Sequence, residues 1–177
     1  GNDFYDKIDM TIRWERGGQN IKEYCKENGK NYQGLSNVDW YSDKSIIFRK
    51  FGNVLRAKYL PEKAMFSSGV YRIKILCDTS LLYVLGYLNS NLFRYLVQGS
   101  NPSLNFNPND AGSIPININI PNETKIAKIS EDCIRERTKK FSLDETVKDF
   151  DTDYFVSTYR RNPTQILYVE DIIESNI

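Results

Sequence analysis

Residues 85–116 read LGYLNSNLFRYLVQGSNPSLNFNPNDAGSIPI, an apolar run followed at once by a segment rich in Asn, Ser and Pro. Between residues 79 and 98, apolar side chains recur every three or four positions, which predicts one helix with a buried face. Over residues 114–120, isoleucines alternate with polar residues, which predicts a strand. The stretch therefore predicts a helix, an Asn-rich loop and a strand in succession.

The ends of the predicted helix carry capping signals. Asp78 or Thr79 is the expected N-cap, and Gly99 stands where a glycine commonly ends a helix. Inside the helix, Asn89 and Ser90 interrupt the apolar face. We expect these two side chains to point to solvent or to cap a neighbouring loop.

Shorter patterns fill the rest of the chain. Strands are expected at residues 8–14, 46–48, 54–60 and 70–76. A helix is expected at residues 21–29, and a second, longer helix is expected after Asn122, with Ile126, Ile129, Cys133 and Ile134 as its buried face. A third helix is expected at residues 142–150, where SLDE forms a capping box. Together they predict an α+β fold in which a mixed β-sheet packs against helices. The expected organisation is a core domain over residues 1–122 and a helical segment over residues 123–177.

The net charge of +1 conceals an uneven distribution. Residues 1–78 hold 14 basic and 10 acidic side chains, whereas residues 123–177 hold 9 basic and 12 acidic ones. A polyanion is therefore expected to meet the N-terminal part first.

The chain contains no histidine, which excludes Ser-His-Asp and Cys-His catalysis and HExxH metal sites. Glycine-rich phosphate loops and the NPPY-type tetrad of amino-methyltransferases are also missing from the sequence. Three widely spaced cysteines favour free thiols in a reducing cytoplasm, and no apolar run reaches membrane-spanning length. With its abrupt ends, the chain is expected to be a cytoplasmic, non-catalytic piece of a larger polypeptide, with no metal or cofactor of its own.

Basic and aromatic residues surround a predicted turn at Gly52 and Asn53. Such a hairpin suits phosphate contact and groove insertion, because arginine can bond guanine while lysine holds phosphates. A solvated strand face is the alternative. The basic candidates for DNA contact are Arg13, Arg16, Lys44, Arg49, Lys50, Arg56 and Lys58.

The Asn-rich loop supplies further candidates: Asn101, Asn105 and Asn107. Asparagine amides pair with the edge of adenine, and they also stabilise turns by bonding nearby backbone. Both interpretations stay open from sequence.

A nuclease pattern is a weaker possibility. Asp110, Glu123 and Lys125 loosely match the carboxylate–carboxylate–lysine set of metal-dependent nucleases. Glu123, however, falls in the first turn of a predicted helix, where an acid complements the helix dipole. We therefore interpret the match as a coincidence.

The segments LGYLNSNLF and NPSLNFNPNDAGSIPI together resemble the C-terminal specificity region of large adenine-specific DNA methyltransferases. These are the PglX-type enzymes of BREX phage-defence systems and the related type IIG restriction-modification enzymes; type I specificity subunits carry a looser version. In the family, an LNS helix precedes a Pro-(Thr/Ser)-x-Asn-Phe loop and an IPI-like strand. SLDETVKDF at 142–150 is similar to the segment that follows the domain. The resemblance spans residues 44–150, with departures at Ser103 and Val147.

The resemblance implies a target-recognition domain that selects DNA sequences for N6-adenine methylation. S-adenosylmethionine and the catalytic tetrad would then belong to a methyltransferase domain elsewhere in the parent protein. The implied partners are double-stranded DNA, that methyltransferase domain and other defence-system subunits. A protein-interaction module with an acidic partner, such as a defence subunit or a phage inhibitor, remains the alternative from residues alone.

Overall fold

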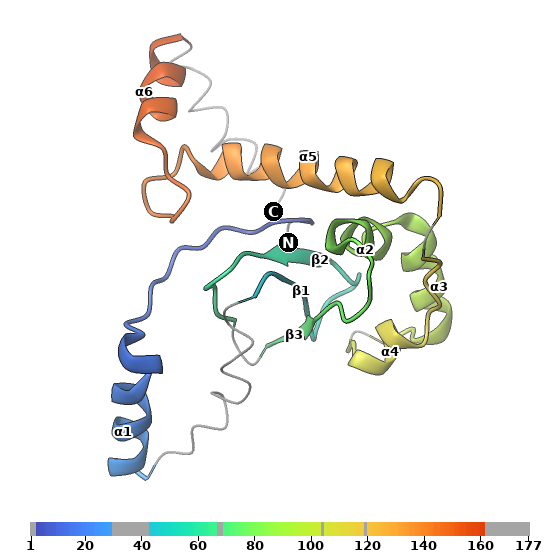
Figure 1. Cartoon of the computed structure of the whole chain (residues 1–177), viewed down its shortest axis with the longest axis horizontal. Coiled ribbons are helices and arrows are strands. Elements are labelled where there is room, and N and C mark those ends of the chain that lie inside the picture. The colour runs from blue at the N-terminus through green and yellow to red at the C-terminus, as the bar shows by residue number, and fades with distance from the viewer. Residues whose placement is uncertain (1–2, 30–42, 67–68, 104, 119, 162–177) are drawn as a thin grey trace. The chain divides into compact units, whose positions relative to one another are not determined.

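The computed structural model describes residues 3–29, 43–66, 69–103, 105–118 and 120–161 (Figure 1). The chain divides into two compact units, Gly1–Asp6 with Ile12–Ile134 and Lys7–Thr11 with Arg135–Ile177. Helices combined with a three-stranded antiparallel sheet confirm the predicted α+β class. The expected domain boundary after residue 122 stays a prediction.

The sheet of the first unit has the order β2-β1-β3. Its strands are β1 (Ser45–Arg49), β2 (Ala57–Leu60) and β3 (Val70–Ile73), so each predicted strand of this region forms, the last two shorter than expected. The strand predicted at residues 8–14 is wrong, because that segment is irregular. It leads into a 3-10 turn, η1 (Glu15–Gly17), and then α1 (Gln19–Glu27), which confirms the first predicted helix.

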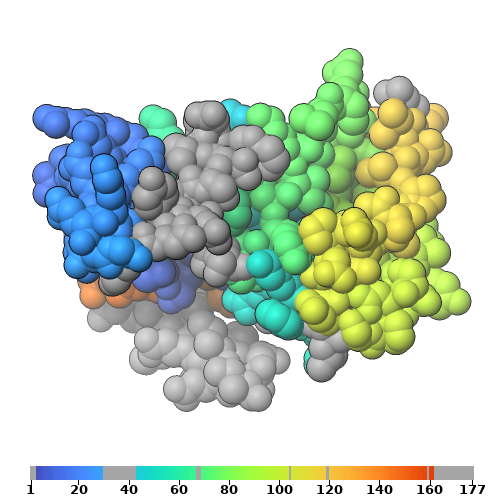
Figure 2. Space-filling model, turned by 90° about the horizontal axis from the view of Figure 1, so that it is seen from below, coloured from blue at the N-terminus to red at the C-terminus, as the bar shows by residue number. Residues whose placement is uncertain are grey.

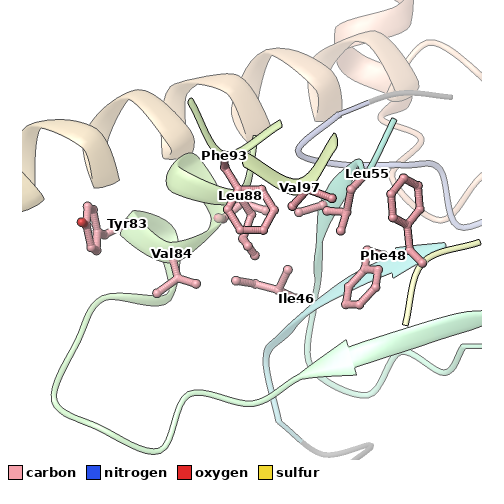
Figure 3. Close-up of a cluster of buried hydrophobic side chains, with 11 residues drawn as sticks. Ile46, Phe48, Leu55, Tyr83, Val84, Leu88, Phe93 and Val97 are labelled. Carbon is pink, nitrogen blue, oxygen red and sulfur yellow. The ribbon is translucent and has the colours of Figure 1, made fainter. Parts of the chain in front are cut away.

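Two short helices, α2 (Leu81–Leu88) and α3 (Asn91–Ser100), form the core with the sheet. Figure 3 shows Ile46 and Phe48 of β1 facing apolar side chains of both helices. Alternation within β1 sends these two residues to one face of the sheet. The buried cluster consists of Ile46, Phe48, Leu55, Ala57, Tyr83, Val84, Leu85, Leu88, Phe93, Val97 and Phe106.

The single helix predicted over residues 79–98 is therefore two helices that break at Asn89 and Ser90. Each helix has its own serine N-cap: Ser80 Oγ accepts from Tyr83 N–H at 3.4 Å, and Ser90 Oγ accepts from Phe93 N–H at 3.1 Å. The N-caps predicted at residues 78 and 79 are thus wrong, as is the C-terminal glycine, since residue 99 lies inside α3.

Asn89 explains the break, because its side chain acts as an extra piece of β-strand. Ala57 N–H donates to Asn89 Oδ1 at 3.0 Å, and Asn89 Nδ2 donates to Ala57 O at 2.9 Å. Phe4 pairs with the same edge, donating to Ala57 O at 3.1 Å and accepting from Tyr59 N–H at 2.7 Å. The outer edge of β2 is therefore covered, which is how sheets avoid exposing unpaired backbone groups.

The strand predicted at residues 114–120 is wrong. The described part of this segment has no strand pairing, although Ile114, Ile116 and Ile120 pack against the core. Its backbone is held by α2 instead: Tyr87 Oη donates to Pro115 O at 2.7 Å, and Tyr83 Oη donates to Asn117 O. Side-chain hydroxyls take the place of a neighbouring strand.

Helices α4 (Pro108–Gly112) and α5 (Glu123–Phe141) follow, and α5 confirms the second long predicted helix. Ile126 and Ile134 pack against the core as expected, but Ile129 is exposed and Ser130 is fully buried in its place. Gly86 of α2 permits this packing, because a Cβ there would lie 2.6 Å from Ser130 Oγ.

The second unit contains a turn over residues 142–151 and helix α6 (Thr152–Arg161). The helix predicted at 142–150 is wrong, since Asp144 closes a local turn by accepting from Thr146 N–H at 3.0 Å. Val147 is buried there, and Lys148 N–H donates to Ile8 O at 2.8 Å.

Candidate nucleic-acid interface

Strand alternation places basic side chains on the sheet face opposite the core. Ile47 and Arg49 alternate with the buried residues of β1. Ile47 pairs with Lys58 on β2 and with Arg72 on β3, and cross-strand partners share a face. We call Arg49, Lys58 and Arg72 the basic face of the sheet.

The β1–β2 turn meets the Asn-rich loop, although the two are far apart in sequence. Phe106 N–H donates to Lys50 O at 2.7 Å, and Phe51 forms an antiparallel bridge with Asn105. Figure 2 shows the two segments side by side, the turn in cyan and the loop in yellow. The structure therefore brings Arg49, Lys50 and Asn105, three of the predicted DNA contacts, together around one turn. Arg49 lies on the sheet face opposite the core, whereas Lys50 lies on the side of Tyr71, the cross-strand partner of Phe48.

Two of the predicted cations are neutralised by the N-terminal segment. Asp3 accepts from Arg56 at 3.0 Å and from Arg94 at 2.8 Å, and Asp6 pairs with Lys58. The Lys58 side chain is only 7% exposed, so its ammonium is directed to Asp6 and not to a surface that a DNA backbone can reach. Arg56 remains 42% exposed and shares its carboxylate with Arg94.

Arg49 and Lys50 carry the uncompensated charge of this turn. Arg49 is exposed and makes no ion pair with any residue that the structure describes. The ammonium of Lys50 lies 4.8 Å from the centre of the Tyr71 ring, a cation–π contact that orients it without removing its charge. Both cations thus remain available to an anion.

The other basic candidates lie outside this cluster. Lys44 pairs with Glu62 at 3.6 Å, and Arg13 pairs with Glu15 at 2.9 Å; all four side chains are exposed. Arg16, inside η1, adopts a left-handed backbone with φ 49°. Within the described part of the chain, no hydrogen bond or ion pair links Arg13 or Arg16 to the sheet.

The asparagines of the loop divide between structure and surface. Asn101 Nδ2 donates to Asn105 O at 2.9 Å and to Asp110 Oδ2 at 2.7 Å, and its Oδ1 accepts from Ser103 N–H at 2.9 Å. Asp110 also accepts from Asn107 N–H at 2.6 Å, at the start of α4. Asn101 is therefore occupied by the loop itself. The exposed Asn105 amide has no hydrogen bond to a described residue and faces solvent.

A pocket of about 350 Å³ lies at the turn, lined by Arg49, Phe51, Gly52, Asn53, Val54, Arg56 and Lys58. Phe51, with 68% of its surface exposed, belongs to this surface but was not among the predicted contacts. Arg72 was also missed, although the alternation of β3 placed it opposite the core. Its position on the basic face follows only from the register between β1 and β3.

The carboxylates of the nuclease pattern are used by the fold. Glu123 Oε1 accepts from Ser80 N–H at 3.0 Å at the start of α2, while Asp110 holds the Asn-rich loop. These contacts account for both acids without a metal ion.

Cys25, Cys77 and Cys133 are free thiols. Among the helices that the structure describes, none is both long enough and apolar enough to cross a membrane.

No curated protein matches the chain. Residues 6–116, which include the sheet, α2, α3 and the Asn-rich loop, match the family model of the TaqI-like C-terminal specificity domain. The match covers more than half of the chain and contains the surface where the turn and the loop meet. The chain therefore belongs to the TaqI-like C-terminal specificity domains, which are DNA-recognition domains of methyltransferases.

Proposed function

We propose that this chain selects the target sequence of an adenine-specific (N6) DNA methyltransferase that acts in restriction–modification or phage defence. The observation that supports the proposal is the junction of the β1–β2 turn with the Asn-rich loop, which brings Arg49, Lys50 and Asn105 together. Guanidinium and ammonium groups suit phosphates and guanine, and an asparagine amide suits adenine. The adenine and defence parts also draw on the resemblance to PglX-type and type IIG enzymes.

Within this proposal, the residues have different tasks. Lys50 holds a backbone phosphate, Arg49 bonds a phosphate or a guanine edge, and Asn105 reads an adenine edge. Arg56 and Lys58 act through their ion pairs, by fixing the N-terminal segment against β2. We propose Arg13, Arg16 and Lys44 as outer phosphate contacts. Asn101 and Asn107 are proposed to hold the shape of the Asn-rich loop.

The chemistry of methyl transfer belongs, in this proposal, to a linked methyltransferase domain. S-adenosylmethionine would bind there and supply the methyl group. The present chain would bind and orient the duplex. Other defence-system subunits are proposed as further partners.

A salt series tests DNA binding. The logarithm of the association constant falls linearly with the logarithm of salt concentration, by about 0.9 for each phosphate neutralised. The Arg49→Gln/Lys50→Gln variant should reduce this slope by about 2, because two cations are lost. Lys128→Gln is the matched control, since Lys128 is an exposed cation on α5 that pairs with Glu131.

An equal slope for the double variant and the control would contradict the proposed interface. Salt-insensitive or absent binding by the unmodified protein would contradict DNA recognition and favour a protein-interaction module.

Genome-wide mapping of methylated bases tests the adenine assignment. Cells that carry the methyltransferase with this domain should contain N6-methyladenine at one sequence motif. Asn105→Ala should relax the motif at a single position, whereas Asn91→Ala, an exposed asparagine of α3, should leave it unchanged. Methylated cytosine in place of adenine would contradict the assignment.

A further inference from the structure

Phe51 is a large apolar side chain displayed at the basic β1–β2 turn. Of the three aromatic residues around this turn, Phe48 is buried and Tyr59 is half-buried, whereas Phe51 is 68% exposed. A single exposed phenylalanine is common on protein surfaces, so exposure alone assigns no role. A role for Phe51 is indicated by its fixed position and by its neighbours.

The backbone that leads into Phe51 is held by two other segments. Lys50 N–H donates to Gly69 O at 3.0 Å, next to β3, and Lys50 O accepts from Phe106 N–H at 2.7 Å. Phe51 itself bridges to Asn105. The ring is therefore presented on a braced turn, and little backbone freedom remains to be lost on binding.

The pocket beside the ring has the lining that a phosphodiester requires. Arg49, Arg56 and Lys58 line the pocket, and Phe51 contributes an apolar wall. Because Arg56 and Lys58 are paired with Asp3 and Asp6, Arg49 is the lining cation whose charge is not neutralised by a described carboxylate. Its planar guanidinium matches two oxygens of one phosphate.

We propose that the pocket holds one backbone phosphate of the DNA and that Phe51 inserts as an apolar wedge at the adjacent base step. This inference rests on the proposed function and adds a residue that reads DNA deformability instead of a base edge. Apolar wedges between base steps unstack and bend duplexes, and easily unstacked steps are favoured. Phe51 then contributes to specificity without a hydrogen bond.

The salt series separates the two parts of this site. Duplexes are first selected from a random pool by the unmodified protein, and each variant is then titrated against them. Phe51→Ala should weaken binding about tenfold, the range of one lost base–aromatic contact, with an unchanged salt slope because no charge is removed. Arg49→Gln should lower the slope by about 1. Leu92→Ala, an equally exposed apolar truncation on α3, is the control and should change neither quantity.

A second readout follows the wedge directly. The selected duplex is labelled with 2-aminopurine at each adenine in turn, and its fluorescence should rise at one step when the protein binds. Phe51→Ala should abolish the rise, whereas Phe51→Leu, which keeps an apolar wedge, should retain most of it.

The inference would be overturned if Phe51→Ala bound DNA within twofold of the unmodified protein, if it changed the salt slope, or if it left the fluorescence rise unchanged. Free deoxynucleotide that competes as well as duplex would overturn the wedge and identify a nucleotide pocket. If the unmodified protein selects no duplex, the proposed function fails first, so the two failures are distinguishable.

Discussion

Asn89→Ala should destabilise the first unit far more than an ordinary asparagine substitution. The variant removes both hydrogen bonds to Ala57, at 3.0 and 2.9 Å, from a side chain that is only 8% exposed. Ala57 O keeps the hydrogen bond from Phe4 N–H, but Ala57 N–H loses its Asn89 acceptor.

The magnitude follows from these contacts. A typical hydrogen bond contributes about 1 kcal/mol net, and a buried donor left unpaired costs about 1–3 kcal/mol. We therefore expect Asn89→Ala to lower the free energy of unfolding by roughly 2–4 kcal/mol. With a denaturant dependence of about 2 kcal/mol per M, the urea midpoint should fall by about 1–2 M.

Urea titration with amide hydrogen exchange checks this prediction. In the unmodified protein the Ala57 amide should be protected, and in Asn89→Ala its exchange should accelerate more than that of other β2 amides. Asn91→Ala, the same truncation at an exposed position two residues away, should change stability by less than about 0.5 kcal/mol. A loss below that limit for Asn89→Ala, or an Ala57 amide that stays protected, would refute the role of Asn89 as an extra piece of strand.

Three further predictions concern packing and pH. Gly86→Ala should lower stability by about 1–3 kcal/mol in thermal unfolding, because its Cβ would lie 2.6 Å from Ser130 Oγ. Adding Ser130→Ala to this variant should restore part of the lost stability. If the stability changes of the two single variants simply add in the double variant, the contact is contradicted. Burial raises the pKa of Tyr83 above 10.0, so its contribution to stability is present below that pH and is lost as pH rises through the folded-state pKa. When the free energy of unfolding is measured at increasing alkaline pH, Tyr83→Phe should therefore lose less stability than the unmodified protein. Hydrogen bonds from Thr146 lower the pKa of Asp144 below 3.8, so its contribution is present above that pH and is lost as pH falls through the lower folded-state pKa. Asp144→Asn should therefore unfold more easily at neutral pH and match the unmodified protein in strong acid; a constant difference across an acid series would contradict this reasoning.

Local patterns in the sequence predicted the elements whose formation depends on near neighbours. The apolar run of β1, the turn at Gly52 and helix α5 appear where they were expected, although Ile129 of α5 is exposed. The α+β class followed from these elements. The family resemblance at residues 85–116 likewise agrees with the specificity-domain match over residues 6–116.

Tertiary contacts decided the remaining features. The alternating isoleucines after residue 113 satisfy a strand pattern, but hydroxyls of Tyr83 and Tyr87 occupy backbone carbonyls where a neighbouring strand would bind. Asn89 looked like an interruption of a helix because its partner, Ala57, lies on a strand elsewhere in the sequence.

The candidate interface shows the same division. Composition identified a basic hairpin and an Asn-rich loop, but only the fold joined them through Lys50 and Phe106. Only the fold, too, showed that the N-terminal carboxylates neutralise Arg56 and Lys58 and leave Arg49 uncompensated. Periodicity depends on residues one helical turn or one strand step apart, and the sequence contains that information directly. Hydrogen-bond partners and charge compensation depend on which distant segments meet, and that is decided when the chain packs its core.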